Sequence, residues 1–254
     1  LDDIPEKMYY VHGKSADNDD KKLTCYSAGT NGLVYQQVII KLPDLPETLH
    51  ALLPIYCACL TELGAGDRDY LETQRWQAGV IGSISAYSSI RGAVDDVQSI
   101  DAYFTLSAKA LTRNQAAMTE LMQDTLEKVR FDEHQRIREL IAQMRARREQ
   151  SVTGNGHSLA LSAASAGMSP AAKLSHKLGG LEGIQAIKAL DTSLQDDAAL
   201  KTFANQLANI HRAIISAPRQ FLLVGEEDRL NAYTHQLNEQ WTNTASKNTD
   251  HFSL

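Results

Sequence analysis

The residues best suited to catalysis in this chain are its histidines, and their spacing excludes a common metal site. Zinc peptidases hold the metal with two histidines four positions apart on one helical face, while a nearby glutamate activates the bound water. The eight histidines are His12, His50, His134, His157, His176, His211, His235 and His251. No two stand four positions apart, so neither His-x-x-Glu-His nor His-Glu-x-x-His occurs. We therefore predict that this chain has no catalytic and no metal-binding residues.

The three cysteines do not form a recognisable metal site either. Cys25 stands alone, while Cys57 and Cys59 lie two positions apart on a predicted helix, where their side chains point to nearly opposite sides. They cannot hold one ion together. We expect buried or half-buried free thiols, as in a protein from a reducing compartment.

A glycine-rich loop and a serine next to a histidine occur together near the middle of the chain. The loop at Gly154–Gly156 lacks the third glycine of a dinucleotide-binding loop and follows a predicted helix instead of a strand. His157 and Ser158 are neighbours in sequence, but a nucleophile also needs a third, orienting group. An unrelated enzyme that uses these residues is the last of three hypotheses for the chain.

The segment from Ser151 to Ala172 is dominated by Gly, Ala and Ser. Small side chains allow a helix to approach a sheet or a neighbouring domain closely. We predict a close-packing interface here. Its candidate residues are Gly154, Gly156, Ala160, Ala163 and Ala164.

Composition is that of a globular protein, with 43% hydrophobic and 22% charged residues. The formal net charge of −6 argues against a nucleic-acid partner, and the absence of an 18-residue apolar run argues against a membrane span. Seven basic residues between Lys128 and Arg148 are interspersed with acidic ones. This favours a solvated helical face over a site for an anionic partner.

The elements that would position these residues follow from changes in apolar spacing. Strands are predicted at about 22–28 and 33–42, joined by a tight hairpin turn at Asn31-Gly32. A helix is predicted at about 46–63, bent at Pro54. Strands over 80–87 and 100–107 each have one apolar and one polar face, and residues 220–224 predict a last buried strand. The fold class is therefore α+β, with helices on one face of a sheet.

Residues 1–21 are expected to form a leading segment with a polar turn, and residues 22–254 one domain. The chain begins with Leu1, and no signal-peptide pattern follows. We interpret it as a piece of a longer protein.

Successive sequence blocks resemble one known family. They are LTCYSAGTNGLVYQQVIIKLPDLP (23–46), DYLETQRW (69–76), GSISAYSSIR (82–91), AYFTLSAKALTRN (102–114), RFDEHQRIRELIAQMRAR (130–147) and GNGHSLALSAASAGMSPAAKLSH (154–176). In this order they resemble the pitrilysin and insulin-degrading superfamily of zinc peptidases, the inverzincins. The resemblance is to the third, non-catalytic domain of its presequence-protease branch.

The resemblance implies a mostly antiparallel sheet whose open face lines an enclosed chamber, as in the metalloprotease and processing-peptidase fold. It also implies that zinc belongs to another domain of the parent protein, while this domain carries no cofactor and helps enclose unfolded peptides such as cleaved targeting sequences. The implied location is the cytoplasm of a bacterium or an organelle such as the mitochondrial matrix. The alternative is a catalytically inactive member that acts as an assembly subunit. A His-x-x-Glu-His motif upstream in the parent gene would favour the first hypothesis.

Overall fold

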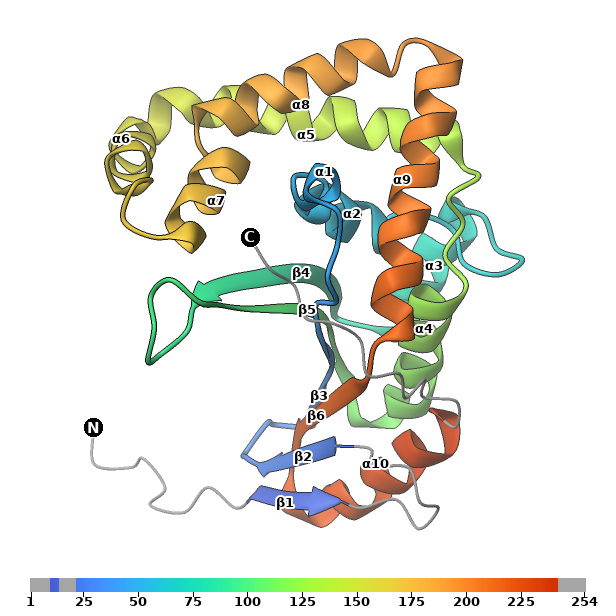
Figure 1. Cartoon of the computed structure of the whole chain (residues 1–254). Coiled ribbons are helices and arrows are strands. Elements are labelled where there is room, and N and C mark those ends of the chain that lie inside the picture. The colour runs from blue at the N-terminus through green and yellow to red at the C-terminus, as the bar shows by residue number, and fades with distance from the viewer. Residues whose placement is uncertain (1–9, 14–21, 242–254) are drawn as a thin grey trace.

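A six-stranded sheet forms the centre of the chain in the computed structural model, which describes residues 10–13 and 22–241 (Figure 1). The strand order is β1-β2-β6-β3-β5-β4. Neighbouring strands are antiparallel except β2 and β6, which are parallel. The strands are β1 (Tyr10–Gly13), β2 (Lys22–Ser27), β3 (Leu33–Lys41), β4 (Ser83–Gly92), β5 (Ile100–Leu111) and β6 (Arg219–Gly225). The polar turn predicted at 13–20 lies outside the described residues, except for Gly13 at the end of β1.

The Asn31-Gly32 turn forms, but the predicted hairpin is wrong. Asn31 and Gly32 have φ angles of 53° and 76°, as this dipeptide favours. The strands on either side do not pair with each other, because β6 lies between them. Strands that flank a third are about 10 Å apart, a distance that the connection 28–32 spans easily. The buried side chain of Phe221 therefore has neighbours from both β2 and β3, at Leu23 and Val38.

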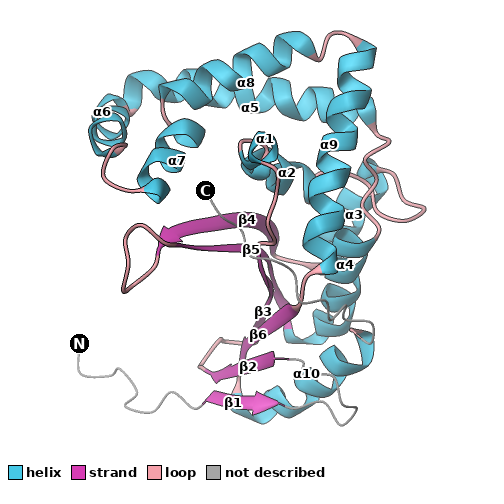
Figure 2. Ribbon diagram, in the orientation of Figure 1, coloured by secondary structure: helices cyan, strands magenta, loops and turns pink. Residues whose placement is uncertain are grey.

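One face of the sheet is covered by helices, as predicted for an α+β fold (Figure 2). The helices that contact the strands are α2 (Leu53–Leu60), α4 (Gln115–Glu127), α7 (Pro170–Gly179) and α10 (Glu227–Gln240). Shorter or more peripheral helices are α1 (Glu47–His50), α3 (Tyr70–Val80) and η1 (Thr112–Asn114). The remaining helices are α5 (His134–Gly154), α6 (Gly156–Ser165), α8 (Leu181–Ser193) and α9 (Asp197–Ser216), where α5 packs on α8 and on α9, and one side of α9 is buried in the core.

The helix predicted at 46–63 is divided into α1 and α2, so Pro54 does not bend a continuous helix. Pro54 instead lies in the first turn of α2. At this position the missing backbone N–H is not needed for an intrahelical bond, and the fixed φ angle suits the helix. The break brings Leu53 and Tyr56 into the core, where both are fully buried.

The period-two pattern of the strands is confirmed. Along β3 the even-numbered positions from Val34 to Ile40 are buried, while Tyr35, Gln37 and Ile39 remain accessible. In β5, Phe104 and Leu106 are fully buried against the helices. The apolar side chains thus share the helix-covered face, and the remaining positions define the opposite face of the sheet.

Candidate functional site

The two buried histidines make separate structural contacts. His50 Nε2 lies 2.8 Å from the carbonyl oxygen of Leu45, and His211 Nδ1 lies 3.0 Å from the hydroxyl of Tyr56. In the described part of the chain, no three His, Cys, Asp or Glu side chains are placed to hold a metal ion. The described residues therefore do not form a zinc site.

His157 and Ser158 lie in the first turn of α6, and both are exposed. Consecutive residues on a helix do not face each other, so the two side chains diverge. The arrangement is not that of a base beside its nucleophile.

All three cysteines are free and buried, as expected. Burial raises the pKa of the Cys57 and Cys59 thiols to about 12. Both side chains therefore remain protonated thiols at neutral pH, which makes them poor nucleophiles and poor metal ligands.

The small-residue segment lies on the surface of the outer layer. Gly154, Gly156, Ala160, Ala163 and Ala164 are all exposed, and a Cβ atom added at either glycine would meet nothing within 4 Å. These residues are therefore not packed against the sheet of this chain. Contact with a neighbouring domain stays a prediction.

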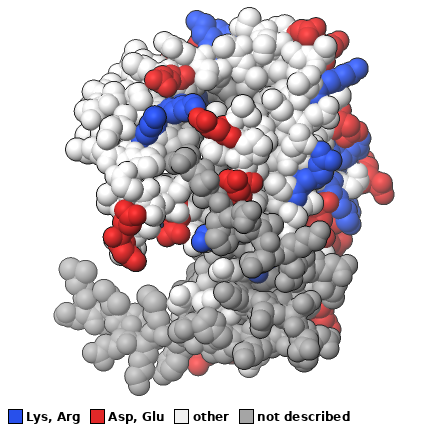
Figure 3. Space-filling model, in the orientation of Figure 1, with Lys and Arg blue, Asp and Glu red and all other residues white. Residues whose placement is uncertain are grey.

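Three arginines of α5 form ion pairs with carboxylates outside that helix. Arg136 pairs with Glu62 at 2.8 Å, and Arg138 pairs with Asp197 at 2.7 Å. Arg145 lies 2.9 Å from Asp191 of α8. On the face seen in Figure 3, the described basic and acidic side chains are interspersed. Three of the seven basic residues of the segment therefore connect α5 to other parts of the fold.

The helix-free face of the sheet is a candidate surface that extends across four strands. Strand register aligns Leu222, Gln37, Ser107 and Ser85 across four strands, and Gln37 Nε2 donates to Ser107 Oγ at 3.4 Å. The next row contains Gln220, Ile39, Thr105 and Tyr87. No Asp or Glu belongs to these two rows. None of the described helices covers this face (Figure 2).

Two tyrosines are exposed on this open face. Tyr35 of β3 is 38% exposed, and Tyr87 of β4 is 43% exposed. Tyrosine offers a large rigid ring and a hydroxyl at a small cost in side-chain entropy, which suits contact with partners of varied sequence. The geometry of this face is that of a broad binding surface without a catalytic group.

A family model for the domain associated with M16 peptidases of subfamily C matches residues 1–190. The chain belongs to this family. It is 26% identical over 219 residues to presequence protease 1, chloroplastic/mitochondrial, of Arabidopsis thaliana, covering 85% of this chain and 20% of the relative. It is 24% identical to the mitochondrial presequence protease of Candida albicans, covering all of this chain and 25% of the relative. The chain thus spans about a fifth to a quarter of these relatives.

The fold agrees with that assignment. The structure titled peptidase M16 inactive domain from Pseudomonas fluorescens aligns with 96% of this chain and 53% of its own, with a TM-score of 0.57 and 17% identity. The chain therefore has the fold of this peptidase family and belongs to the pitrilysin family. The expected resemblance to the presequence-protease branch is confirmed by the relatives.

The sequence patterns did not reveal the full extent of the open face in this pitrilysin-family domain. They separated the polar sides of β4 and β5, but did not predict that Gln220, Leu222 and Val224 of β6 continue the same surface. Strand β6 is about 180 residues further along the chain than β3, and pairing over such a separation leaves no local signal. The apolar character of residues 220–224 was the only signal for the strand.

Proposed function

We propose that this chain is a non-catalytic wall of a peptidase chamber, whose open sheet face contacts unfolded peptides such as cleaved targeting sequences. The catalytic zinc site belongs to another domain of the same protein in this proposal. The working location is the mitochondrial matrix or another organelle in a eukaryote, or the cytoplasm in a bacterium.

The observation that carries the proposal is the one-sided covering of the sheet. Its open face combines exposed tyrosine rings with hydroxyl and amide groups, and the two central rows contain no carboxylate. Such a surface can bind an extended chain through aromatic contact and hydrogen bonds without selecting one sequence. In a closed chamber, selection would then depend first on whether the peptide is unfolded and small enough to enter.

Replacing both exposed tyrosines tests the proposal in the complete protein. The double variant Tyr35→Ser, Tyr87→Ser removes contacts made equally by the bound substrate and its transition state. We expect KM for an unstructured presequence peptide to rise about tenfold with little change in kcat. Zinc content measured on the same preparations should be unchanged.

The matched control is Val94→Ala. Val94 is 99% exposed in the β4–β5 connection and lies outside the open face, so its loss should leave KM unchanged. An unaltered KM in the double tyrosine variant would contradict the proposed role of this face.

A further inference from the structure

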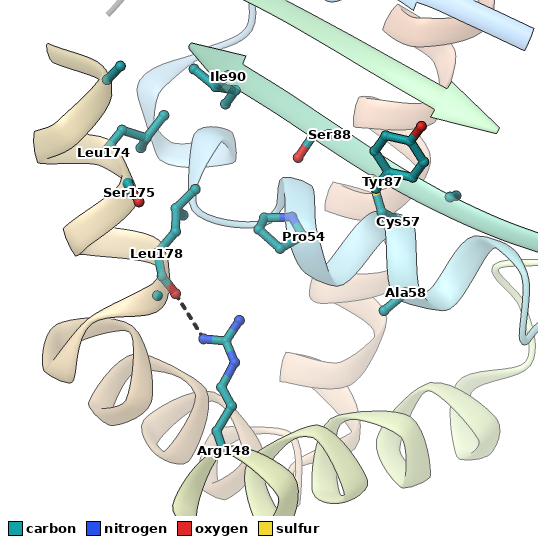
Figure 4. Close-up of a pocket in the computed structure, with 13 residues that line it drawn as sticks. Pro54, Cys57, Ala58, Tyr87, Ser88, Ile90, Arg148, Leu174, Ser175 and Leu178 are labelled. Atoms are coloured by element: carbon teal, nitrogen blue, oxygen red, sulfur yellow. Dashed lines mark hydrogen bonds between the residues drawn. The ribbon is translucent and has the colours of Figure 1, made fainter. Parts of the chain in front are cut away.

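A cavity of about 440 Å³ lies between α2, β4 and α7, on the helix-covered side of the sheet (Figure 4). Its walls are largely apolar, with side chains from Pro54, Ile90, Leu174 and Leu178. At one end, Arg148 of α5 points its guanidinium toward the space between α2 and α7. A cation at the end of an apolar cavity is an unusual combination, because burying charge is unfavourable without a partner.

Arg148 differs from Arg136 and Arg145 of the same helix in its partners. Its Nη1 donates to the carbonyl oxygen of Leu178 at 2.9 Å and to that of Gly183 at 3.3 Å. Among the described residues no carboxylate lies within ion-pair distance of it, whereas Arg136 and Arg145 each pair with one on another element. Nη2 has no hydrogen-bond partner in the described part of the chain. Two carbonyl groups thus hold the Arg148 side chain in place, while Nη2 of its guanidinium group remains able to donate hydrogen bonds to a ligand.

The environment of Arg148 favours an incoming anion. The side chain is half-buried, and burial lowers the pKa of its guanidinium from the ordinary value. Arginine nevertheless stays charged at neutral pH. A carboxylate placed against Nη2 and Nε would restore the lost solvation through charge-assisted hydrogen bonds.

The rest of the cavity favours a peptide as the carrier of that carboxylate. The apolar walls fit one aliphatic or aromatic side chain. β4, which lines the cavity, is an edge strand of the sheet among the described strands, so one row of its backbone groups is not used in the ladder. The hydroxyls of Ser88 and Ser175 also line the cavity and add hydrogen-bonding capacity.

We propose that this cavity binds the free carboxyl end of a peptide whose last side chain is apolar, with the carboxylate on Arg148. The site lies on the helix-covered side of the sheet, and Tyr87 of β4 also lines it. The variants used below leave both tyrosines unchanged, so this proposal and the proposed chamber wall can each fail without the other.

Binding of a labelled peptide to the 254-residue chain tests the proposal. The probe is the tetrapeptide Gly-Gly-Ala-Leu with fluorescein at its amino end, followed by fluorescence anisotropy. We expect saturable binding of the free acid, and binding of the carboxyl-amidated peptide to be at least about tenfold weaker. Equal binding of acid and amide, or no saturable binding of the acid, would overturn the proposal.

Two variants and a control locate the site. Arg148→Met keeps the aliphatic stem and removes the charge, so the acid should bind no better than the amide. Ser175→Trp fills the mouth of the cavity from an exposed position on α7 and should abolish binding while Arg148 and its carbonyl partners remain. Arg147→Met removes the adjacent exposed charge, which does not line this cavity, and should bind like the parent chain.

Two further outcomes of the binding experiment need a defined interpretation: a variant that does not fold and a probe that a fatty acid displaces. Circular dichroism establishes whether each variant is folded, and Ser175→Trp supplies the decision if Arg148→Met unfolds. Unchanged binding in a folded Ser175→Trp chain would overturn the assignment to this cavity. Octanoate that displaces the probe at a lower concentration than unlabelled peptide would identify a fatty acid as the occupant and would equally overturn it.

Discussion

Tyr56 and His211 form the principal hydrogen-bonded pair in the core of this domain. The Tyr56 ring is fully buried between Phe104 and Phe131, and its hydroxyl lies 3.0 Å from His211 Nδ1. Burial lowers the pKa of His211 to about 4, with a further contribution from the positive charge of Arg219. Burial also raises the pKa of Tyr56 well above its usual value. The neutral ring and the neutral phenol therefore share one hydrogen bond, whose direction depends on the tautomer of His211.

The depressed pKa of His211 predicts a loss of stability in mild acid. The unfolded chain binds a proton at this histidine near pH 6.5, whereas the folded chain binds it only near pH 4. The unfolded state therefore holds more protons between these values. Lowering the pH from about 7 to 4 should reduce the free energy of unfolding by about 3 kcal/mol through this group. Urea unfolding measured across this range gives the total change.

A second measurement tests whether the change in stability with pH comes from His211. NMR titration of the His211 ring should give a pKa near 4. The variant His211→Asn should lose this part of the pH dependence. Titration of the ring near pH 6.5 in the folded chain would show that burial does not keep His211 neutral.

At the scale of elements, the apolar spacing predicted where the strands lie in the sequence better than it predicted which strands pair with each other. The residues of β3 and β5 could be assigned because alternation is a local property of each segment, and those of β6 because they form a short apolar run. The insertion of β6 between β2 and β3 could not, since pairing depends on which buried surfaces fit together. The helix α8 was missed entirely, and Pro54 was misplaced within a helix that in fact begins beside it.

The two faces of β5 give a direct test of the sheet assignment. Phe104 is fully buried on the helix side, so Phe104→Ala should reduce the free energy of unfolding by about 3–5 kcal/mol. Tyr103 is next to it on the open face and only partly buried, so Tyr103→Ala should cost about 1 kcal/mol or less. Chemical denaturation of both variants provides the comparison. Equal losses would contradict the assignment of the two faces.

Local sequence also revealed only some features of the candidate site residues. The lack of a histidine pair was readable from spacing alone, because both zinc motifs are short and contiguous. The ion pairs of α5 were not readable, since their partners lie at Glu62, Asp191 and Asp197 on other elements. For the same reason, no local pattern indicated that Arg148 is half-buried without a carboxylate partner among the described residues.

At the scale of the whole molecule, the exposed small residues of α6 predict a contact with another domain. A bulky side chain there would overpack such an interface at a typical cost of about 1–3 kcal/mol. Ala163→Trp should therefore lower peptidase activity in the complete protein while its zinc content stays unchanged. Full activity would contradict a tight contact at this position.

The isolated chain is the control for that substitution. Ala163 is exposed in the chain, so Ala163→Trp should leave its thermal unfolding unchanged. Loss of stability in the isolated chain would instead indicate a contact with its own core.

The account as a whole depends on the open sheet face meeting substrate. Photo-crosslinking in the complete protein tests this most directly, with a benzophenone amino acid in place of Tyr87 on the open face or of Leu71 on α3. Both positions are similarly exposed, at 43% and 45%. We predict that an unfolded presequence peptide crosslinks at position 87 and not at position 71. Equal crosslinking at the two positions, or none at position 87, would contradict the central claim.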